Sequence, residues 1–249
     1  MALIQEMERQ GNWLFRYRGQ IPVVLFLLAI PVVYLHSGAP APVWLLPVAG
    51  SLSVMGAVIR AYTIGTTPRG TSGRNTRQQV AESLNTSGIY SLVRHPLYLG
   101  NYLMWIGIVA YSGSLGFTAL VTLLYWLYYE RIMMAEEAFL TGKFGTAYRE
   151  WSQEVPPFVP RMGPFRSPSV PFSIRSVFRR EYSGWLATVT GFAYVDCLRV
   201  FASGNFVGVE SLTACWSYWR FPLGFALVIT LLLRTLKRHT SVLNEEGRS

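Results

Sequence analysis

The sequence is poor in charged residues, cysteine and histidine. Asp, Glu, Lys and Arg make up only 14% of its 249 residues, against 51% hydrophobic residues, and its mean hydropathy is +0.29. This composition excludes an ordinary soluble globular domain. The two cysteines, Cys197 and Cys215, lie in or beside apolar runs without metal-binding spacing. We therefore expect both to serve in packing, and we expect no disulfide framework.

Long apolar runs dominate the sequence instead. Several of them approach the about 20 residues that a membrane-spanning helix needs. We predict an all-α, polytopic integral membrane protein with about six transmembrane helices, at residues 21–36, 43–64, 97–111, 115–132, 184–206 and 212–233. The third and fourth runs are short, and Ser112-Gly113-Ser114 between them predicts a tight helical hairpin.

The basic residues are distributed unevenly among these runs. The net charge is +9, and all but two of the 22 Lys and Arg residues, Arg199 and Arg220, fall in segments on one side of the predicted membrane. By the positive-inside rule this side is cytoplasmic, and it holds both termini. The positive charge thus indicates topology and attraction to anionic head groups. We expect a multi-pass protein, of the cytoplasmic membrane if the source is bacterial, and no nucleic-acid partner.

A first polar pattern, R-H-P-L-Y-L-G, stands at the start of the third run and covers residues 94–100. Pro96 suits the first position of a helix. Arg94 and His95 are then at the helix N-terminus, with Tyr98 in its first turn. Free backbone N–H groups and an arginine favour a carboxylate or phosphate there. Alternatively, Arg94 is only a topology anchor and Tyr98 belongs to an aromatic belt.

A second polar pattern follows the fourth run. Glu136 and Glu137 precede apolar residues that recur every three or four positions, and Gly142 and Gly145 predict a helix break. The prolines of residues 155–161, V-P-P-F-V-P-R, end helical structure. The paired carboxylates either form a solvated helix surface or receive a cationic or hydroxyl-rich ligand. In the second case, aromatic residues of the same segment would enclose the ligand.

Taken in order, these patterns are R-H-P-x-Y-x-G, a hairpin, E-E-x-x-L-x-x-x-F-G-x-x-Y-x-x-W and V-P-x-x-x-P. They resemble the isoprenylcysteine carboxyl methyltransferase family, which is related to the phospholipid N-methyltransferases. The resemblance covers about half of the chain and is strongest over residues 43–161. It implies an integral membrane methyltransferase with S-adenosylmethionine bound on the cytosolic side. By this resemblance the catalytic residues are Arg94, His95 and Tyr98, and the cofactor-binding residues are Tyr90, Arg94, His95, Tyr98, Gly100, Glu136, Glu137 and Tyr148.

Two other functions are compatible with part of these patterns. Membrane sterol reductases share R-H-P-x-Y and use NADPH, but an acidic residue tends to follow the motif's glycine in them, where this chain has Asn101. They also usually lack the paired glutamates, so both differences favour methyl transfer. A non-catalytic membrane scaffold or transporter is the third possibility. Against transport, the sequence has no inverted repeat.

The acceptor is expected to be a lipid or a lipidated molecule within the bilayer. We predict that Arg60, Arg69, Arg74 and Arg77 bind it, or else are plain topology signals. Such arginines suit an anionic group, which favours O-methylation of a lipid phosphate, such as a lipid A phosphate, or of a prenylated carboxylate. A phospholipid amine is the alternative acceptor, and it would first have to lose a proton. We expect no metal to take part.

We divide the chain into a methyltransferase core at 1–161, a basic interfacial linker at 162–183, and an extension at 184–249 with two additional transmembrane helices and a cytoplasmic tail. The extension departs from the compact form of the family. It contains Asp196 and Arg199 within one apolar run. Charges inside a membrane helix are costly. We therefore expect the two side chains to pair with each other, or Arg199 to extend to the interface.

Overall fold

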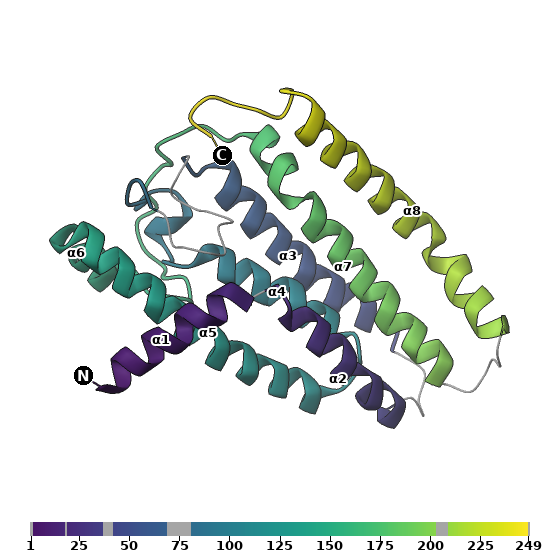
Figure 1. Cartoon of the computed structure of the whole chain (residues 1–249). Helices are drawn as coiled ribbons and strands as arrows, with labels where there is room; N and C mark the ends of the chain where they lie inside the picture. Colours follow the sequence, from purple (N-terminus) through teal and green to yellow (C-terminus); the bar gives the residue numbers. More distant parts are fainter. Residues whose placement is uncertain (1, 18, 37–41, 69–80, 203–208, 249) are drawn as a thin grey trace.

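The described part of the chain is helical throughout. The computed structural model describes residues 2–17, 19–36, 42–68, 81–202 and 209–248, and within these ranges it has no β-strand, only an isolated bridge between Gly88 and Arg166. The helices in Figure 1 are α1 (Ala2–Tyr17), α2 (Ile21–His36), α3 (Leu45–Gly65), the short 3-10 helix η1 (Ile89–Ser91), α4 (Pro96–Ala110), α5 (Leu115–Phe144), α6 (Thr146–Glu154), α7 (Ile174–Ala202) and α8 (Val209–His239). The predicted all-α fold is confirmed.

The helices follow the predicted apolar runs. α2 coincides with the first run, and α3 and α4 differ from the second and third by at most two residues at either end. α5, however, continues past residue 132 to Phe144, and α7 begins at Ile174, inside the segment expected to be a linker. Among the described residues, α3, α7 and the Cys215–His239 part of α8 are long and apolar enough to cross a membrane, and α2 and α4 contain shorter apolar helices. The fold is that of a polytopic membrane protein, while the number of spans stays a prediction.

Small residues allow α3 and α4 to pack closely in the bundle. A Cβ atom on Gly56 of α3 would lie 2.5 Å from the backbone oxygen of Gly100 in α4, and one on Gly107 would lie 2.3 Å from Ser53 Oγ. Ser53 also donates a hydrogen bond of 2.8 Å to the backbone oxygen of Met104. Such contacts are typical of membrane helices, because close backbone approach gives packing energy where lipid is as apolar as the side chains.

Proline and glycine define the helix ends near the R-H-P motif. α4 begins at Pro96, as predicted, where the missing N–H would have no helical partner anyway. α5 gives way to α6 at Gly145, whose φ of +56° is readily adopted only by glycine. The break predicted at Gly142 or Gly145 therefore occurs at Gly145. α6 ends at Glu154, directly before the proline-rich segment 155–161.

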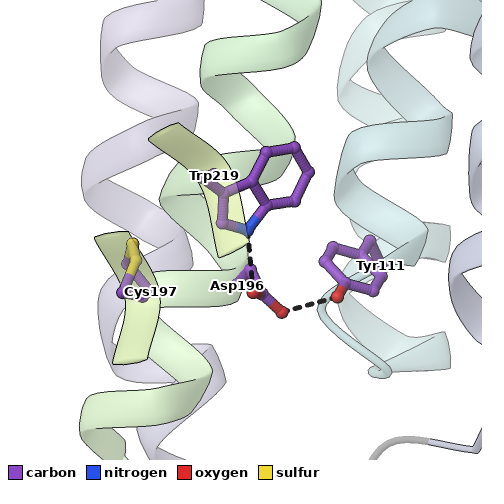
Figure 2. The surroundings of a disulfide bond; sticks show 5 residues. Tyr111, Asp196, Cys197 and Trp219 are labelled. Carbon is purple, nitrogen blue, oxygen red and sulfur yellow. Dashed lines mark hydrogen bonds between the residues drawn. A yellow bond between two sulfur atoms is a disulfide. The ribbon is translucent and has the colours of Figure 1, made fainter. Parts of the chain in front are cut away.

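At the opposite end of the bundle, a disulfide between Cys197 and Cys215 joins α7 to α8 (Figure 2). The Cα atoms of the two cysteines are 5.5 Å apart, and 18 positions separate them in the sequence. The expectation that both cysteines serve only in packing was wrong. It failed because α7 and α8 form an antiparallel hairpin, in which residues at similar distances from the connection face each other.

Asp196 and Arg199 each have their own partners at this end. The carboxylate of Asp196 accepts hydrogen bonds from the Tyr111 hydroxyl (2.6 Å) and from Trp219 Nε1 (2.8 Å), as Figure 2 shows. Arg199 Nη1 donates to the backbone oxygen of Tyr111 (2.8 Å), and its guanidinium lies 5.6 Å from the centroid of the Tyr111 ring. The two side chains thus do not form the expected ion pair. We call the region of Tyr111, Asp196 and the two cysteines the disulfide end, and the region of the R-H-P motif the motif end.

Candidate active site

Backbone hydrogen bonds from the proline-rich segment hold the R-H-P motif. The N–H of Arg94 donates to the backbone oxygen of Pro156 (2.9 Å), and the N–H of His95 donates to that of Pro157 (3.1 Å). Because prolines keep this segment out of a helix, its carbonyl oxygens are available as acceptors. The N–H of Arg161 donates in the other direction, to the oxygen of Leu92 (3.0 Å). The two motifs therefore form one structural unit.

α5 brings Glu137 against this unit. Its carboxylate accepts a hydrogen bond of 2.7 Å from Arg94 Nη1 and lies 2.9 Å from His95 Nε2. The side chain of Glu137 is 25% exposed and that of Arg94 14%. Ion pairs shielded from water in this way are stronger than pairs on an open surface, where screening reduces them to at most about 1 kcal/mol.

The neighbouring Glu136 contacts the other side of the motif. Its Oε2 accepts a hydrogen bond of 2.9 Å from the Tyr98 hydroxyl and lies 3.6 Å from His95 Nδ1. The rings of His95 and Tyr98 are stacked with centroids 5.5 Å apart. His95 thus has one carboxylate at each ring nitrogen. We call Arg94, His95, Tyr98, Glu136 and Glu137 the RHP–glutamate cluster; the structure brings these five predicted residues together.

The two carboxylates favour the charged form of His95. Burial would lower the pKa of its imidazole, but hydrogen bonds to Glu136 and Glu137 and their negative charges together raise this pKa above its ordinary value of 6.5. A protonated imidazole donates from both nitrogens and so satisfies both carboxylates. In this state His95 is a bound cation and not a free general base.

An aromatic wall lies beside the cluster. Tyr148, Trp151 and Val155 form a buried hydrophobic group, in which the Tyr148 and Trp151 rings meet edge to face with centroids 5.6 Å apart. Partly buried side chains pack against this group, namely Leu84, Tyr90, Leu140 and Phe144. Residues that precede Gly145 and residues that follow it thus pack into one group, in agreement with their spacing in the sequence.

Three buried side-chain atoms near this wall have no hydrogen bond of normal geometry with the described residues. They are Arg94 Nε, the Tyr148 hydroxyl and Trp151 Nε1. Burial, together with the charge of Glu137, raises the pKa of Tyr148, and the charge of Arg94 and its contact with the hydroxyl only partly offset this rise. The hydroxyl therefore keeps its proton and can donate. A buried polar group without a partner costs about 1–3 kcal/mol. Three such donors in one region favour a ligand that carries acceptor oxygens.

Tyr90 connects the aromatic wall with the first turns of α7. Burial and the charge of Glu136 raise the pKa of the Tyr90 hydroxyl, whereas the charge of Arg180 and a hydrogen bond with Thr67 act in the opposite direction. Arg180 is a buried residue in the first turns of α7. The C-terminal tail also reaches this region, since Arg248 donates to the backbone oxygen of Thr67 at 3.4 Å.

Of the four predicted substrate-binding arginines, three lie outside the described residues: Arg69, Arg74 and Arg77. Arg60, in α3, donates to the carboxylate of Glu181 in α7 through Nε (2.7 Å) and Nη2 (2.6 Å). It also donates to Asn101 Oδ1 in α4 through Nη1 (2.5 Å). Sequence reasoning missed Glu181, although it is the one acidic residue in the basic segment 162–183 and could have been singled out for that reason.

Gly100, predicted to bind cofactor, has a packing role in the structure. A Cβ atom at this position would lie 2.5 Å from Arg60 Cγ and 2.9 Å from the backbone oxygen of Gly56. Close contact between α3 and α4 is therefore a sufficient reason for glycine here. As for metals, the described residues contain no group of three or more His, Cys, Asp or Glu side chains that could hold an ion. That no metal takes part stays a prediction.

Comparisons with known proteins indicate the class of this helical membrane protein, an integral membrane methyltransferase. A family model described as phospholipid methyltransferase matches residues 46–147. The cobalt-zinc-cadmium resistance protein CzcN of Cupriavidus metallidurans is 31% identical over 159 residues, which are 64% of this chain and 70% of the relative. The chain belongs to the phospholipid methyltransferase family, which includes the isoprenylcysteine carboxyl methyltransferases.

Enzymes named for their substrate are also among the relatives. The protein-S-isoprenylcysteine O-methyltransferase of Schizosaccharomyces pombe is 35% identical over 77 residues, 31% of this chain and 33% of the relative. Protein-S-isoprenylcysteine O-methyltransferase B of Arabidopsis thaliana is 31% identical over 120 residues, 47% of this chain and 60% of the relative. The chain thus spans about a third and three fifths of these two proteins. No solved structure matches the chain significantly.

Proposed function

We propose that this protein transfers a methyl group from S-adenosylmethionine to an anionic oxygen of an amphiphile in the membrane. The observation that carries the proposal is the RHP–glutamate cluster, in which Arg94, His95 and Tyr98 meet Glu136 and Glu137 beside partnerless buried donors. Acidic and basic groups side by side suit a methyl donor that has both an ammonium and a carboxylate group.

The residues at the motif end fit S-adenosylmethionine chemically. The carboxylates of Glu136 and Glu137 suit its ammonium group and ribose hydroxyls, and the partnerless donors of Arg94, Tyr148 and Trp151 suit its carboxylate. When bound, the cofactor supplies a methyl group made electrophilic by a positively charged sulfur. The chain's own residues would orient this group and exclude water, which is the main requirement of an in-line displacement.

The state of His95 favours an acceptor that needs no base. An amine or thiol must lose a proton before it attacks, whereas a carboxylate or phosphate oxygen is already anionic. Both ring nitrogens of His95 face a carboxylate, so neither is free to take a proton from an acceptor. O-methylation is therefore the better-supported reaction: the acceptor oxygen bonds to the methyl carbon while the carbon–sulfur bond breaks. Its acceptor would be a prenylated carboxylate or a lipid phosphate, such as a lipid A phosphate.

The names of the relatives support this class of acceptor. Two of the enzymes to which the chain is similar act, by name, on an S-isoprenylcysteine oxygen. N-methylation of a phospholipid amine is the second candidate, since the matching family model is described by phospholipid methylation. Membership in this family makes NADPH-dependent reduction and a non-catalytic role weaker alternatives.

A labelling experiment tests the proposal. The purified full-length chain is incubated with methyl-labelled S-adenosylmethionine and, in turn, S-farnesyl-N-acetylcysteine, phosphatidic acid, phosphatidylethanolamine and a total lipid extract. We expect label on a carboxylate or a phosphate. Mild base separates the two, because it releases methanol from a carboxyl methyl ester and leaves the phosphate ester intact.

Two results would overturn the proposal at different levels. Label confined to amine head groups would replace O-methylation by N-methylation. Absence of any label, together with no thermal stabilisation by S-adenosylhomocysteine, would exclude methyl transfer. A ligand present at 100 times its Kd and bound only by the folded protein adds about 2.7 kcal/mol of stability. Stabilisation by NADPH instead would favour a reductase.

A further inference from the structure

The most deeply buried carboxylate near the motif end lies in the segment 162–183, which the sequence assigned to a linker. Glu181, in the second turn of α7, has a side chain that is 0% exposed. A buried carboxylate is strongly unfavourable unless a cation and hydrogen bonds compensate it. Both of its oxygens are used by a single partner, Arg60 of α3, at 2.7 Å and 2.6 Å. This bidentate contact fixes the plane and direction of the guanidinium.

The described partners of Arg60 do not use all the N–H groups of its guanidinium. It has five N–H groups, of which Glu181 takes two and Asn101 takes one. Two N–H groups are therefore left without a partner among the described residues. The side chain of Arg60 is 16% exposed, so these donors are shielded but can be reached.

Arg60 is held directly beside the RHP–glutamate cluster. Asn101, its partner in α4, follows Tyr98 by three residues and so lies on the same helix face one turn further along. One turn of α-helix rises about 5.4 Å. Tyr98 itself donates to Glu136. The guanidinium of Arg60 is thus held about one turn of α4 beyond the contact between Tyr98 and Glu136.

We propose that Glu181 is a positioning residue for acceptor recognition: it orients Arg60 so that the two remaining N–H donors bind the anionic oxygen that is methylated. The inference rests on the proposed function and identifies which described arginine serves the acceptor. It also gives α7, the first helix after the methyltransferase core, a part in the reaction. The chemistry recognised is an oxyanion, of a carboxylate or of a phosphate ester.

Three sets of variants test this role. Glu181→Gln removes the charge that orients Arg60, Arg60→Lys keeps a cation without a fork, and the double variant Arg60→Glu/Glu181→Arg restores an ion pair with the charges exchanged. Glu154→Gln is the matched control, because it breaks an exposed pair with Arg166 of 3.2 Å. The measurements are thermal unfolding, the Kd of S-adenosylhomocysteine, and KM and kcat for the anionic amphiphile that the wild type labels, S-farnesyl-N-acetylcysteine or phosphatidic acid.

We expect Glu181→Gln and Arg60→Lys to raise KM for that amphiphile by about tenfold or more, with the Kd of S-adenosylhomocysteine within about twofold of the wild type. The exchanged pair should recover thermal stability but not KM, since a carboxylate at position 60 repels the acceptor. Glu154→Gln should change neither the thermal stability nor the KM.

Recovery of both stability and KM in the exchanged pair would mean that Arg60 and Glu181 only clamp α3 to α7, and would overturn the inference. Wild-type KM in Glu181→Gln would overturn it too. Both results leave the methyltransferase assignment intact. A wild type that labels no carboxylate and no phosphate, in the total lipid extract as well as in the two amphiphiles, would instead overturn the anionic acceptor, and the inference with it.

Discussion

The motif end and the disulfide end both contain acidic side chains, but the two ends hold them differently. At the motif end, Glu137 is bound by the cationic groups of Arg94 and His95. At the disulfide end, Asp196 is bound by neutral donors of Tyr111 and Trp219. Charged partners and nearby partnerless donors leave the motif end able to accept a charged ligand. The acid at the disulfide end already has a hydrogen bond on each oxygen, which is sufficient for a structural role.

The two ends also differ in how their helices are joined. Ion pairs and hydrogen bonds connect α3, α4, α5 and α7 at the motif end, whereas a covalent bond connects α7 to α8 at the other. Disulfides form and persist in oxidising compartments. The cross-link therefore supports the orientation predicted from the basic residues, with the motif end toward the cytoplasm and the disulfide end away from it.

The largest expected effect is the loss of Glu137. Glu137→Ala removes the carboxylate that pairs with Arg94 and His95, each through a charge-assisted contact. Such contacts contribute roughly 1.5–3 kcal/mol each. The proposed function also places this carboxylate at the ammonium group or ribose of the cofactor, so we expect the loss of one such contact to lower the affinity for S-adenosylhomocysteine by about 10- to 100-fold. Isothermal titration calorimetry of the detergent-solubilised protein measures this affinity.

A matched control for this prediction is Glu150→Ala on the exposed side of α6, which should leave the affinity unchanged. If Glu137→Ala bound S-adenosylhomocysteine as the wild type does, the cluster would not be the cofactor site. The two ends would then differ only in whether charged or neutral groups bind their carboxylates.

A smaller effect is expected from His95. Because its pKa is raised in the folded protein, its contribution to stability is fully present below the ordinary value of 6.5 and is lost as pH rises through the folded-state pKa. Wild-type stability should therefore fall more steeply than that of His95→Gln as pH rises above about 6.5. Thermal unfolding of both proteins across this range is the measurement. Parallel curves would show that His95 is not charged in the folded state.

The smallest effect on activity is expected at the disulfide end. Replacing Cys197 and Cys215 by serine should lower the free energy of unfolding by about 3 kcal/mol and change methyl transfer by less than about twofold, since the site is at the other end. Thermal unfolding and the labelling assay give the two values. After mild reduction, an impermeant maleimide should label Cys197, the less buried of the two cysteines, from the non-cytoplasmic side. A loss of activity as large as that of Glu137→Ala would remove the distinction between the two ends.

Much of the fold could be predicted because its signals are local. The apolar runs gave α2, α3 and α4 nearly to the residue, and the backbone restrictions of Pro96 and Gly145 gave a helix start and a helix break. The apolar residues at every third or fourth position after residue 132 also predicted helix up to the break, although not that it would be continuous with the fourth apolar run. The start of α7 at Ile174 was not predicted, because the basic residues of segment 162–183 carry no membrane signal.

The candidate site could be assembled from sequence only in part. The R-H-P and paired-glutamate patterns indicated which residues take part, and the structure brings them into hydrogen-bonding distance. The partner of Arg60 was missed because 121 positions separate it from Glu181, and a single glutamate in a basic segment has no pattern of its own. The support from Pro156 and Pro157 was missed because backbone acceptors leave no trace in side-chain patterns.

Residue order along the chain determines where helices begin and end here, since length, apolarity and backbone restriction act over a few neighbouring residues. It also identifies the residue types that a methyl donor would require. Which side chains meet depends on how the helices rotate and pack against one another. That packing separated Asp196 from Arg199, joined Cys197 to Cys215 and paired Arg60 with Glu181. Contacts of this kind join distant segments, so no local pattern specifies them.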